Sequence, residues 1–191
     1  MYDLVITNGK LVTPDRIYEA DIAVKDGVYA AFLAKGSQAA AKEVIDAKGC
    51  YIYPGIIDCH AHLNEPGFEY REDFETGSRA AAAAGCTCLI DMPLNNDPSL
   101  MNKEIFDLKM GRISKHSYVD FALWGGLIPS SLKDMSEMHD LGCIGFKGFM
   151  SFATEAYPRI SDGYLVEGMR LSERFGGLIA LHAENAEVAD F

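Results

Sequence analysis

Two histidines stand two residues apart at the end of an apolar run. Residues 56–62 read IIDCHAH, and alternate residues of a strand share a face, so His60 and His62 point the same way, together with Asp58. Two imidazoles in this arrangement can chelate a divalent metal ion. Hydrogen-bonded histidines that cap a core have the same spacing, so the pair by itself leaves both interpretations open.

Two further candidates also stand at the ends of apolar runs. Lys147 lies within GFKGF (145–149), where a buried ammonium must shift its pKa or find a partner, unless its head reaches solvent. His182 follows the apolar start of LIALHAE (178–184), and a lone histidine in such a place is more often a hydrogen-bonded core residue than a metal ligand. His116 and His139 stand at predicted helix ends, and we expect both on the surface.

The elements that must position these side chains fall into two parts. Residues 1–53 carry short apolar stretches of β type, separated by Asn8-Gly9 and Asp26-Gly27, which favour two-residue hairpins. We expect them to form a small β-rich domain. The pattern changes near residues 53–55, so the second domain is expected over 54–191.

From there, apolar strands alternate with helical patterns. The predicted strands are 56–62, which we expect to be buried, 87–92, 119–127, 143–149 and 178–184, and the predicted helices are 74–85, 103–115, 131–140 and 163–175. This alternation predicts right-handed crossovers and a parallel sheet, which brings the candidates to the carboxyl ends of strands. A (β/α)₈ barrel typically needs about 250 residues. The 191 residues therefore predict either a small open α/β sheet or the front portion of a barrel.

Composition excludes several classes of protein. A net charge of -11 and the lack of a basic stripe argue against nucleic-acid binding. The longest nearly apolar run, 80–90, is shorter than the roughly 18–20 residues that cross a bilayer, and the first residues do not resemble an export signal. Five cysteines without C-x-x-C spacing read as reduced thiols. We therefore expect a cytoplasmic protein that does not contact membranes.

Longer motifs carry a resemblance to a known family. PGIIDCHAHLNEPG (54–67), DFETGSRAAAAAGCTCLIDMPLN (73–95), GFKGF and LHAEN (181–185) resemble the cyclic amidohydrolases of the amidohydrolase superfamily, and within it the allantoinases. The resemblance covers the whole chain. It implies a (β/α)₈ TIM barrel, of which residues 54–191 would supply the first five βα units, preceded by part of a small β-sandwich.

The resemblance also implies a centre of two divalent metal ions. His60 and His62 would bind one ion, His182 the other, and carbamylated Lys147 would bridge both. Zinc is the expected metal, with cobalt, manganese or iron as alternatives, because such ligand sets accept all of them. Water activated by the ions would attack a ring amide carbonyl. The family's further histidine and its catalytic aspartate would lie beyond Phe191, so no catalytic residue is expected within this chain.

Two asparagines bear on the substrate. Dihydroorotases of this lineage carry an arginine, which binds the substrate carboxylate, where this chain has Asn64. The neutral ring of allantoin suits Asn64 better, and Asn95 is either a second substrate contact or a turn residue. The leading hypothesis is hydrolysis of allantoin to allantoate in purine catabolism, by a homotetramer. A dihydroorotase or hydantoinase (dihydropyrimidinase), a non-catalytic scaffold and a free-standing binding module remain as alternatives.

Overall fold

The computed structural model describes residues 1–189. The chain forms two compact units that divide between Pro54 and Gly55. Among the described residues, every helix is too short or too polar to span a membrane. Each unit is described by itself below.

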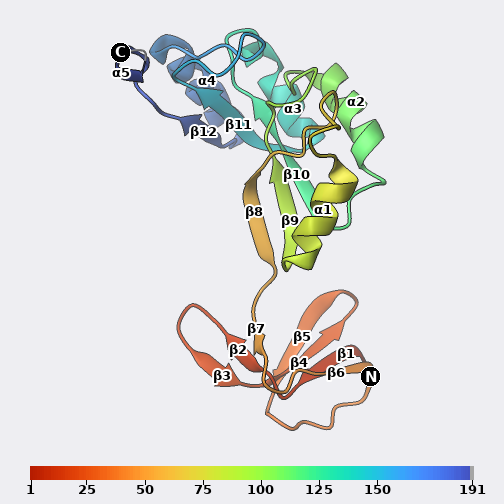
Figure 1. Ribbon diagram of the computed structural model, residues 1–191. Helices are drawn as coiled ribbons and strands as arrows, with labels where there is room; N and C mark the ends of the chain where they lie inside the picture. Colours follow the sequence, from red (N-terminus) through yellow and green to blue (C-terminus); the bar gives the residue numbers. More distant parts are fainter. Residues whose placement is uncertain (190–191) are drawn as a thin grey trace. The chain divides into compact units, whose positions relative to one another are not determined.

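The first unit contains two small mixed sheets (Figure 1). One sheet has the strand order β5-β4-β1-β6, and the other has the order β3-β2-β7. The strands are β1 (Tyr2–Thr7), β2 (Lys10–Val12), β3 (Ile17–Glu19), β4 (Asp21–Lys25), β5 (Val28–Leu33), β6 (Ala41–Asp46) and β7 (Tyr51–Ile52). β1 pairs in parallel with β6, and β2 in parallel with β7, whereas the other pairs are antiparallel.

Only one of the two expected hairpins forms. Asp26 (φ 54°) and Gly27 (φ 77°) adopt left-handed conformations and join the antiparallel strands β4 and β5, as expected. The prediction for Asn8-Gly9 is wrong, because β1 and β2 belong to different sheets. Asn8 instead binds Asp21 and Asp46 with its backbone N–H and its side chain, and a Cβ at Gly9 would lie 2.3 Å from the side chain of Ile52. Asn8 and Gly9 therefore form a close-packed turn that joins β1 of one sheet to β2 of the other.

The second unit is a parallel sheet whose strands follow chain order. It consists of β8 (Ile56–Ala61), β9 (Cys86–Asp91), β10 (Asp120–Gly126), β11 (Cys143–Phe149) and β12 (Ile179–His182). Each strand pairs with the next in parallel, so all carboxyl ends meet at one edge. The prediction that the first of these strands is buried is wrong. β8 is an edge strand paired with β9 alone among the described residues, and Ile57 on it is 63% exposed.

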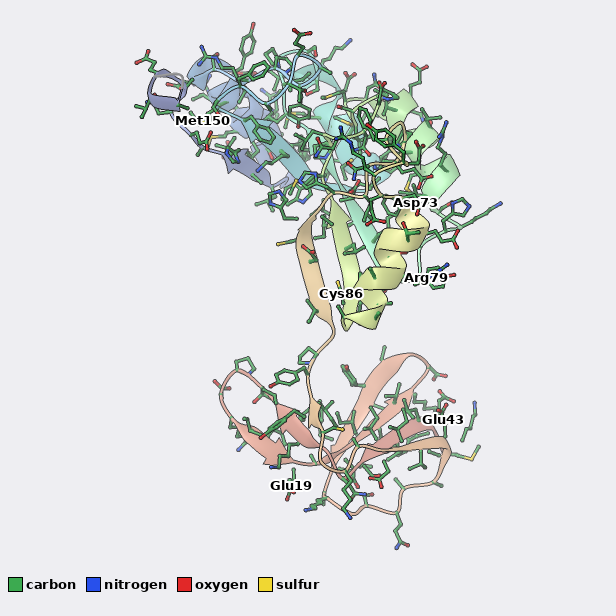
Figure 2. The ribbon with its side chains drawn as sticks, in the orientation of Figure 1. Glu19, Glu43, Asp73, Arg79, Cys86 and Met150 are labelled. Carbon is green, nitrogen blue, oxygen red and sulfur yellow. The ribbon has the colours of Figure 1, made fainter. Side chains whose placement is uncertain are left out.

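Helices connect these strands and lie against one face of the sheet (Figure 1). They are α1 (Phe74–Ala83), α2 (Lys103–Ile113), η1 (Leu132–Asp134), α3 (Met135–Leu141) and α4 (Asp162–Phe175), and the short helix α5 (Ala186–Ala189) follows β12. The expected single helix over 131–140 is thus a 3₁₀ turn followed by an α-helix. Asp73, labelled in Figure 2, begins α1 by accepting the N–H of Thr76, and Gly85 (φ 84°) follows its end.

Two apolar clusters fix the sheet and its loops. The larger one packs helices on the sheet and includes the fully buried rings of Phe74 and Phe146. The smaller one lies near the carboxyl ends of the strands and includes Met92, Trp124 and Tyr157. Trp124 Nε1 donates to the carbonyl of Cys59 at 3.1 Å, and the hydroxyl of Tyr157 donates to the carbonyl of Lys147 at 2.5 Å. Side chains of the smaller cluster therefore fix the backbone of β8 and β11 next to the candidate residues.

Candidate metal centre

The histidine pair lies at the carboxyl end of β8. The ring centroids of His60 and His62 are 5.3 Å apart, and the ring planes are inclined by 55°. Asp58, the third residue on this face, accepts the backbone N–H of His60 at 3.0 Å. His60 is exposed and His62 half-buried, so the two imidazoles are adjacent and accessible.

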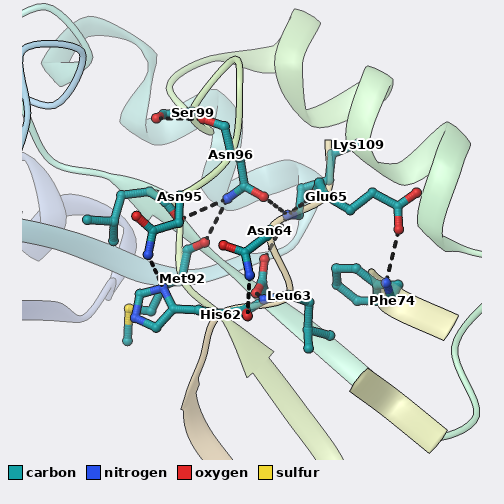
Figure 3. Close-up of polar contacts among 12 residues, drawn as sticks. His62, Leu63, Asn64, Glu65, Phe74, Met92, Asn95, Asn96, Ser99 and Lys109 are labelled. Carbon is teal, nitrogen blue, oxygen red and sulfur yellow. Dashed lines mark hydrogen bonds and ion pairs between the residues drawn. The ribbon is translucent and has the colours of Figure 1, made fainter. Parts of the chain in front are cut away.

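Burial lowers the pKa of His62, and the nearby His60 and Lys147 lower it further, against the opposing effect of the Asp91 carboxylate. The imidazole is consequently neutral at pH 7, which is the form that binds metal ions. Its Nδ1 lies 3.3 Å from Nδ2 of Asn95, a contact drawn in Figure 3.

Lys147 lies on β11, between β10 and β12 in the sheet. It is the fifth residue of β11, paired in register with Gly126 of β10 and Ala180 of β12, and is only 4% exposed. Its stem is buried, whereas Nζ retains some access to solvent. Nζ lies 5.1 Å from the centroid of the Phe149 ring, and it has no hydrogen bond or ion pair to any residue in 1–189. Burial lowers its pKa, which favours the neutral amine.

His182 is the last residue of β12. It is paired in register with Phe149 and stacks on the Phe149 ring, with centroids 5.2 Å apart. Its Nε2 lies 3.0 Å from Oε1 of Glu184, whose other oxygen accepts the hydroxyl of Ser151 at 2.9 Å. Hydrogen bonds from His182 and then Ser151 lower the pKa of Glu184, so the carboxylate is charged at pH 7.

The two candidate substrate residues, Asn64 and Asn95, both contact His62. Asn64 Nδ2 donates to the carbonyl of His62 at 3.1 Å, and Asn95 contacts the His62 ring. Asn64 (φ 52°) and Asn95 (φ 63°) both adopt the left-handed conformation. Asn95 also lines a cavity of about 520 Å³, which Phe68 and Arg71 border.

The remaining histidines lie outside this centre. His116 is exposed just after α2, as expected. The expectation that His139 is a surface residue is wrong in part. Its ring is half-buried and stacks on Phe175 with centroids 4.8 Å apart, because α3 packs on α4 at this point.

Reasoning from the sequence missed a buried polar network directly beside the histidine pair. Lys109 of α2, only 1% exposed, forms an ion pair of 2.7 Å with Asp91 and also binds Glu65 and Asn96 (Figure 3). A signal existed, because Lys109 stands on the helix face that buries Phe106 and Ile113. A lysine in such a stripe indicates a buried partner.

The donor types fit a divalent metal centre. Among residues 1–189, no group of three or more His, Cys, Asp or Glu side chains is arranged to hold an ion. The described donors are the adjacent imidazoles of His60 and His62, together with Lys147, close enough to His62 to affect its pKa.

Comparison with known proteins matches the chain to a family over most of its length. The model of the amidohydrolase family matches residues 51–190. The chain is 41% identical over 191 residues to an allantoinase of Bacillus velezensis, covering all of this chain and 42% of that protein. It is 37% identical over 190 residues to an L-hydantoinase of Paenarthrobacter aurescens, covering 98% of this chain and 41% of that protein.

A solved structure confirms the expected fold. The L-hydantoinase (dihydropyrimidinase) structure from Arthrobacter aurescens matches with a TM-score of 0.94 and 37% identity, over all of this chain and 42% of that one. Small sheets followed by a parallel half-barrel sheet are therefore the N-terminal part of a barrel architecture. The chain spans about 42% of the length of these relatives.

Proposed function

The chain belongs to the amidohydrolase family, and from this we propose that the protein hydrolyses a cyclic amide with the help of divalent metal ions. The observation that carries the proposal is the adjacent pair of His60 and His62 at the carboxyl end of β8, in the same parallel sheet as buried Lys147 of β11. Chemistry in parallel α/β barrels takes place at this end of the strands. Resemblance to allantoinases and hydantoinases supports the same reaction class.

Each candidate ligand has a stated part in this proposal. His60 and His62 would hold one ion, and His182 would hold a second, with zinc the expected metal and cobalt, manganese or iron the alternatives. Bound ions of this kind polarise a carbonyl group and lower the pKa of water. The low pKa of His62 keeps its ring in the neutral, ligating form without competition from a proton.

Lys147 would act as a carbamate. Because burial lowers the pKa of Lys147, a larger fraction of its amine is neutral, and the lone pair of that form can attack the carbon of CO₂. A new N–C bond forms, one C–O π bond breaks, and the nitrogen loses a proton. The product is an anion with two oxygens, which removes the cost of a buried, unpartnered ammonium and offers an oxygen to each of two ions.

We propose allantoin as the substrate, with allantoate as the product. An uncharged side chain at position 64 offers no ionic partner to a substrate carboxylate, which a dihydroorotate would need. Allantoin carries a neutral ureido arm, and Asn95 borders a cavity of about 520 Å³ that has room for a ring of this size.

Hydantoins are the second candidate substrates. The fold match to an L-hydantoinase, with a TM-score of 0.94, favours them on structural grounds, and their ring is the one that allantoin contains. The identity to an allantoinase, 41%, is somewhat higher than the 37% to an L-hydantoinase, and we therefore place allantoin first.

The test compares ring opening of allantoin, hydantoin and dihydroorotate. The protein is used in its natural full-length form and is supplied with zinc, cobalt or manganese. Allantoin is expected to have a kcat/KM at least about tenfold above dihydroorotate, a difference of about 1.4 kcal/mol. A preference for dihydroorotate would overturn the substrate assignment. Metal-loaded protein that opens none of the three rings would favour a scaffold function instead.

A further inference from the structure

A fully buried ammonium connects three segments around the histidine pair. Nζ of Lys109 donates to the carbonyl of Glu65 at 2.6 Å, to Oδ2 of Asp91 at 2.7 Å and to Oδ1 of Asn96 at 2.9 Å (Figure 3). A lysine ammonium has three N–H groups, so every donor is used. One side chain of α2 thereby holds the loop after β8, the end of β9 and the loop after β9.

The three acceptors are directly linked to the candidate metal centre. Asp91 uses its other oxygen, Oδ1, to accept the backbone N–H of Leu63 at 2.8 Å, which fixes the residue next to His62. Asn96 follows Asn95 in the chain, and its Nδ2 donates to the carbonyls of Met92 and Leu94, each at 3.1 Å. Lys109 is thus linked through Asp91 to the backbone next to His62. Through Asn96 it is linked to the backbone next to Asn95.

These two loops each contain a left-handed residue. Asn64 and Asn95, one in each loop, have positive φ angles of 52° and 63°. Asparagine tolerates this region better than other non-glycine residues, and contacts with neighbouring segments help to keep it there. The loops are also joined directly, because the N–H of Asp97 donates to the carbonyl of Pro66 at 2.8 Å, so displacement of one loop would carry the other with it.

A stability argument does not account for a lysine at this position. Taking an ammonium and a carboxylate out of water costs about as much as their attraction returns, and apolar residues of similar volume often serve a core equally well. Phe106 and Ile113 show that the surrounding helix face is apolar. What a lysine supplies, and an apolar residue cannot, is three donors at one point between three segments.

We propose that Lys109 is a positioning residue of the candidate metal centre, which sets the orientation of the His62 ring through the two loops. The inference rests on the proposed function for its metal readout, but its structural readout is independent of any metal. Lys103 on the same helix provides a matched control, because its ion pair with Asp107 is exposed and involves none of these acceptors.

The first experiment uses metal-free protein in its natural full-length form. NMR of histidine ring nitrogens and amide hydrogen exchange are compared in the wild type, Lys109→Met and Lys103→Met. In Lys109→Met the His62 ring signals shift, and the Leu63 amide exchanges at least tenfold faster, while Phe146 in β11 keeps its protection. Lys103→Met matches the wild type. Unchanged His62 signals in folded Lys109→Met protein would overturn the proposal.

The second experiment separates positioning from folding. Lys109→Met leaves the Asp91 carboxylate buried without a cation, so the double variant Asp91→Asn with Lys109→Met serves as a folded version without that charge. The introduced amide can still accept the N–H of Leu63, but the introduced thioether cannot donate to Glu65 or Asn96. Zinc affinity, measured by competition with a chelator, is expected to remain at least tenfold weaker in the double variant, although its melting temperature recovers.

The outcomes distinguish the two proposals. Wild-type zinc affinity in the double variant would show that Lys109 is needed for folding alone, and would refute the positioning role. Wild-type protein that binds no metal would refute the proposed metal centre, while the His62 ring signals would still decide the part played by Lys109.

Discussion

The side-chain amide of Asn95 contacts the imidazole of His62, with 3.3 Å between Asn95 Nδ2 and His62 Nδ1. As placed, the Asn95 amide N–H donates to Nδ1, which leaves the proton of the neutral ring on Nε2. Binding of a metal ion by Nε2 requires the amide to be reversed, so that Nδ1–H donates to its oxygen and Nε2 keeps its lone pair. A residue expected to bind substrate or cap a turn thus supports a candidate ligand.

Removal of this support weakens metal binding. We expect Asn95→Ala to lower zinc affinity about 10–100-fold, because the ring loses the partner that fixes its orientation. Asn95→Asp retains an acceptor for Nδ1–H and is expected to retain most of the affinity. Competition with a chelator measures both variants. Unchanged affinity in Asn95→Ala would mean that the contact has no part in orienting His62.

The side chain at position 64 is expected to determine the preference for substrate charge. Asn64→Arg places a cation beside the histidine pair, where it can bind a substrate carboxylate with charge-assisted hydrogen bonds. The ratio of kcat/KM for allantoin to that for dihydroorotate should fall at least about tenfold, as measured by ring opening of both substrates. Asn64→Gln, which adds length without charge, is the control. An equal loss on both substrates would contradict a role in selectivity.

The N-cap of α1 should contribute stability that depends on pH. Oδ1 of Asp73 accepts the N–H of Thr76 at 2.7 Å, and hydrogen bonds from the Thr76 backbone and hydroxyl lower the pKa of Asp73 from its ordinary value of 3.8. A depressed carboxyl pKa adds stability above the unfolded pKa, and that stability is lost as the pH falls through the folded pKa. Asp73→Ala should cost about 1 kcal/mol at pH 7.

Denaturant unfolding at pH 7 and near pH 3 measures this cost. We expect the difference between wild type and Asp73→Ala to shrink as the pH falls below 3.8, where the unfolded chain binds the proton more readily than the folded one. Asn caps helices as well as Asp does, so Asp73→Asn should stay close to the wild type at pH 7. A cost that is independent of pH would show that the charge of Asp73 has no part in the cap.

The thiols should differ in reactivity. Burial raises the pKa of Cys143 to about 12, so almost none of its reactive thiolate exists at pH 8. Iodoacetamide at that pH should therefore leave Cys143 unmodified in native protein and label it after denaturation, whereas exposed Cys50 reacts in both states. Peptide mass spectrometry reads both sites. Rapid native labelling of Cys143 would contradict its burial at the start of β11.

The sequence predicts the parallel unit well because local signals and tertiary packing agree there. Apolar strands alternate with capped helices, so the observed order of β8 to β12 follows from the pattern. The prediction that β8 is buried was wrong, because an apolar strand at a sheet edge can have the same composition as one in the middle of a sheet. The prediction of a hairpin at Asn8-Gly9 was wrong, because these two residues favour a sharp turn but do not determine whether the strands on either side pair with each other.

The candidate site is only partly readable from the sequence for a similar reason. His60 and His62 are adjacent because strand periodicity brings them together, and this spacing is local. The contacts of Lys109 with Glu65 and Asp91 join residues 44 and 18 positions apart, which only the fold brings together. The stacking of His182 on Phe149 likewise depends on the register of β11 with β12.

The most direct test of the central claim is the metal content of the protein in its natural full-length form, compared with that of Lys147→Ala. We predict about two divalent ions per chain in the wild type, and loss of most of this metal in Lys147→Ala, because the bridging carbamate cannot form. Elemental analysis of purified protein after dialysis, with circular dichroism to verify folding, gives both numbers. Wild-type metal content in folded Lys147→Ala, or an active wild type with one ion or none, would contradict the account.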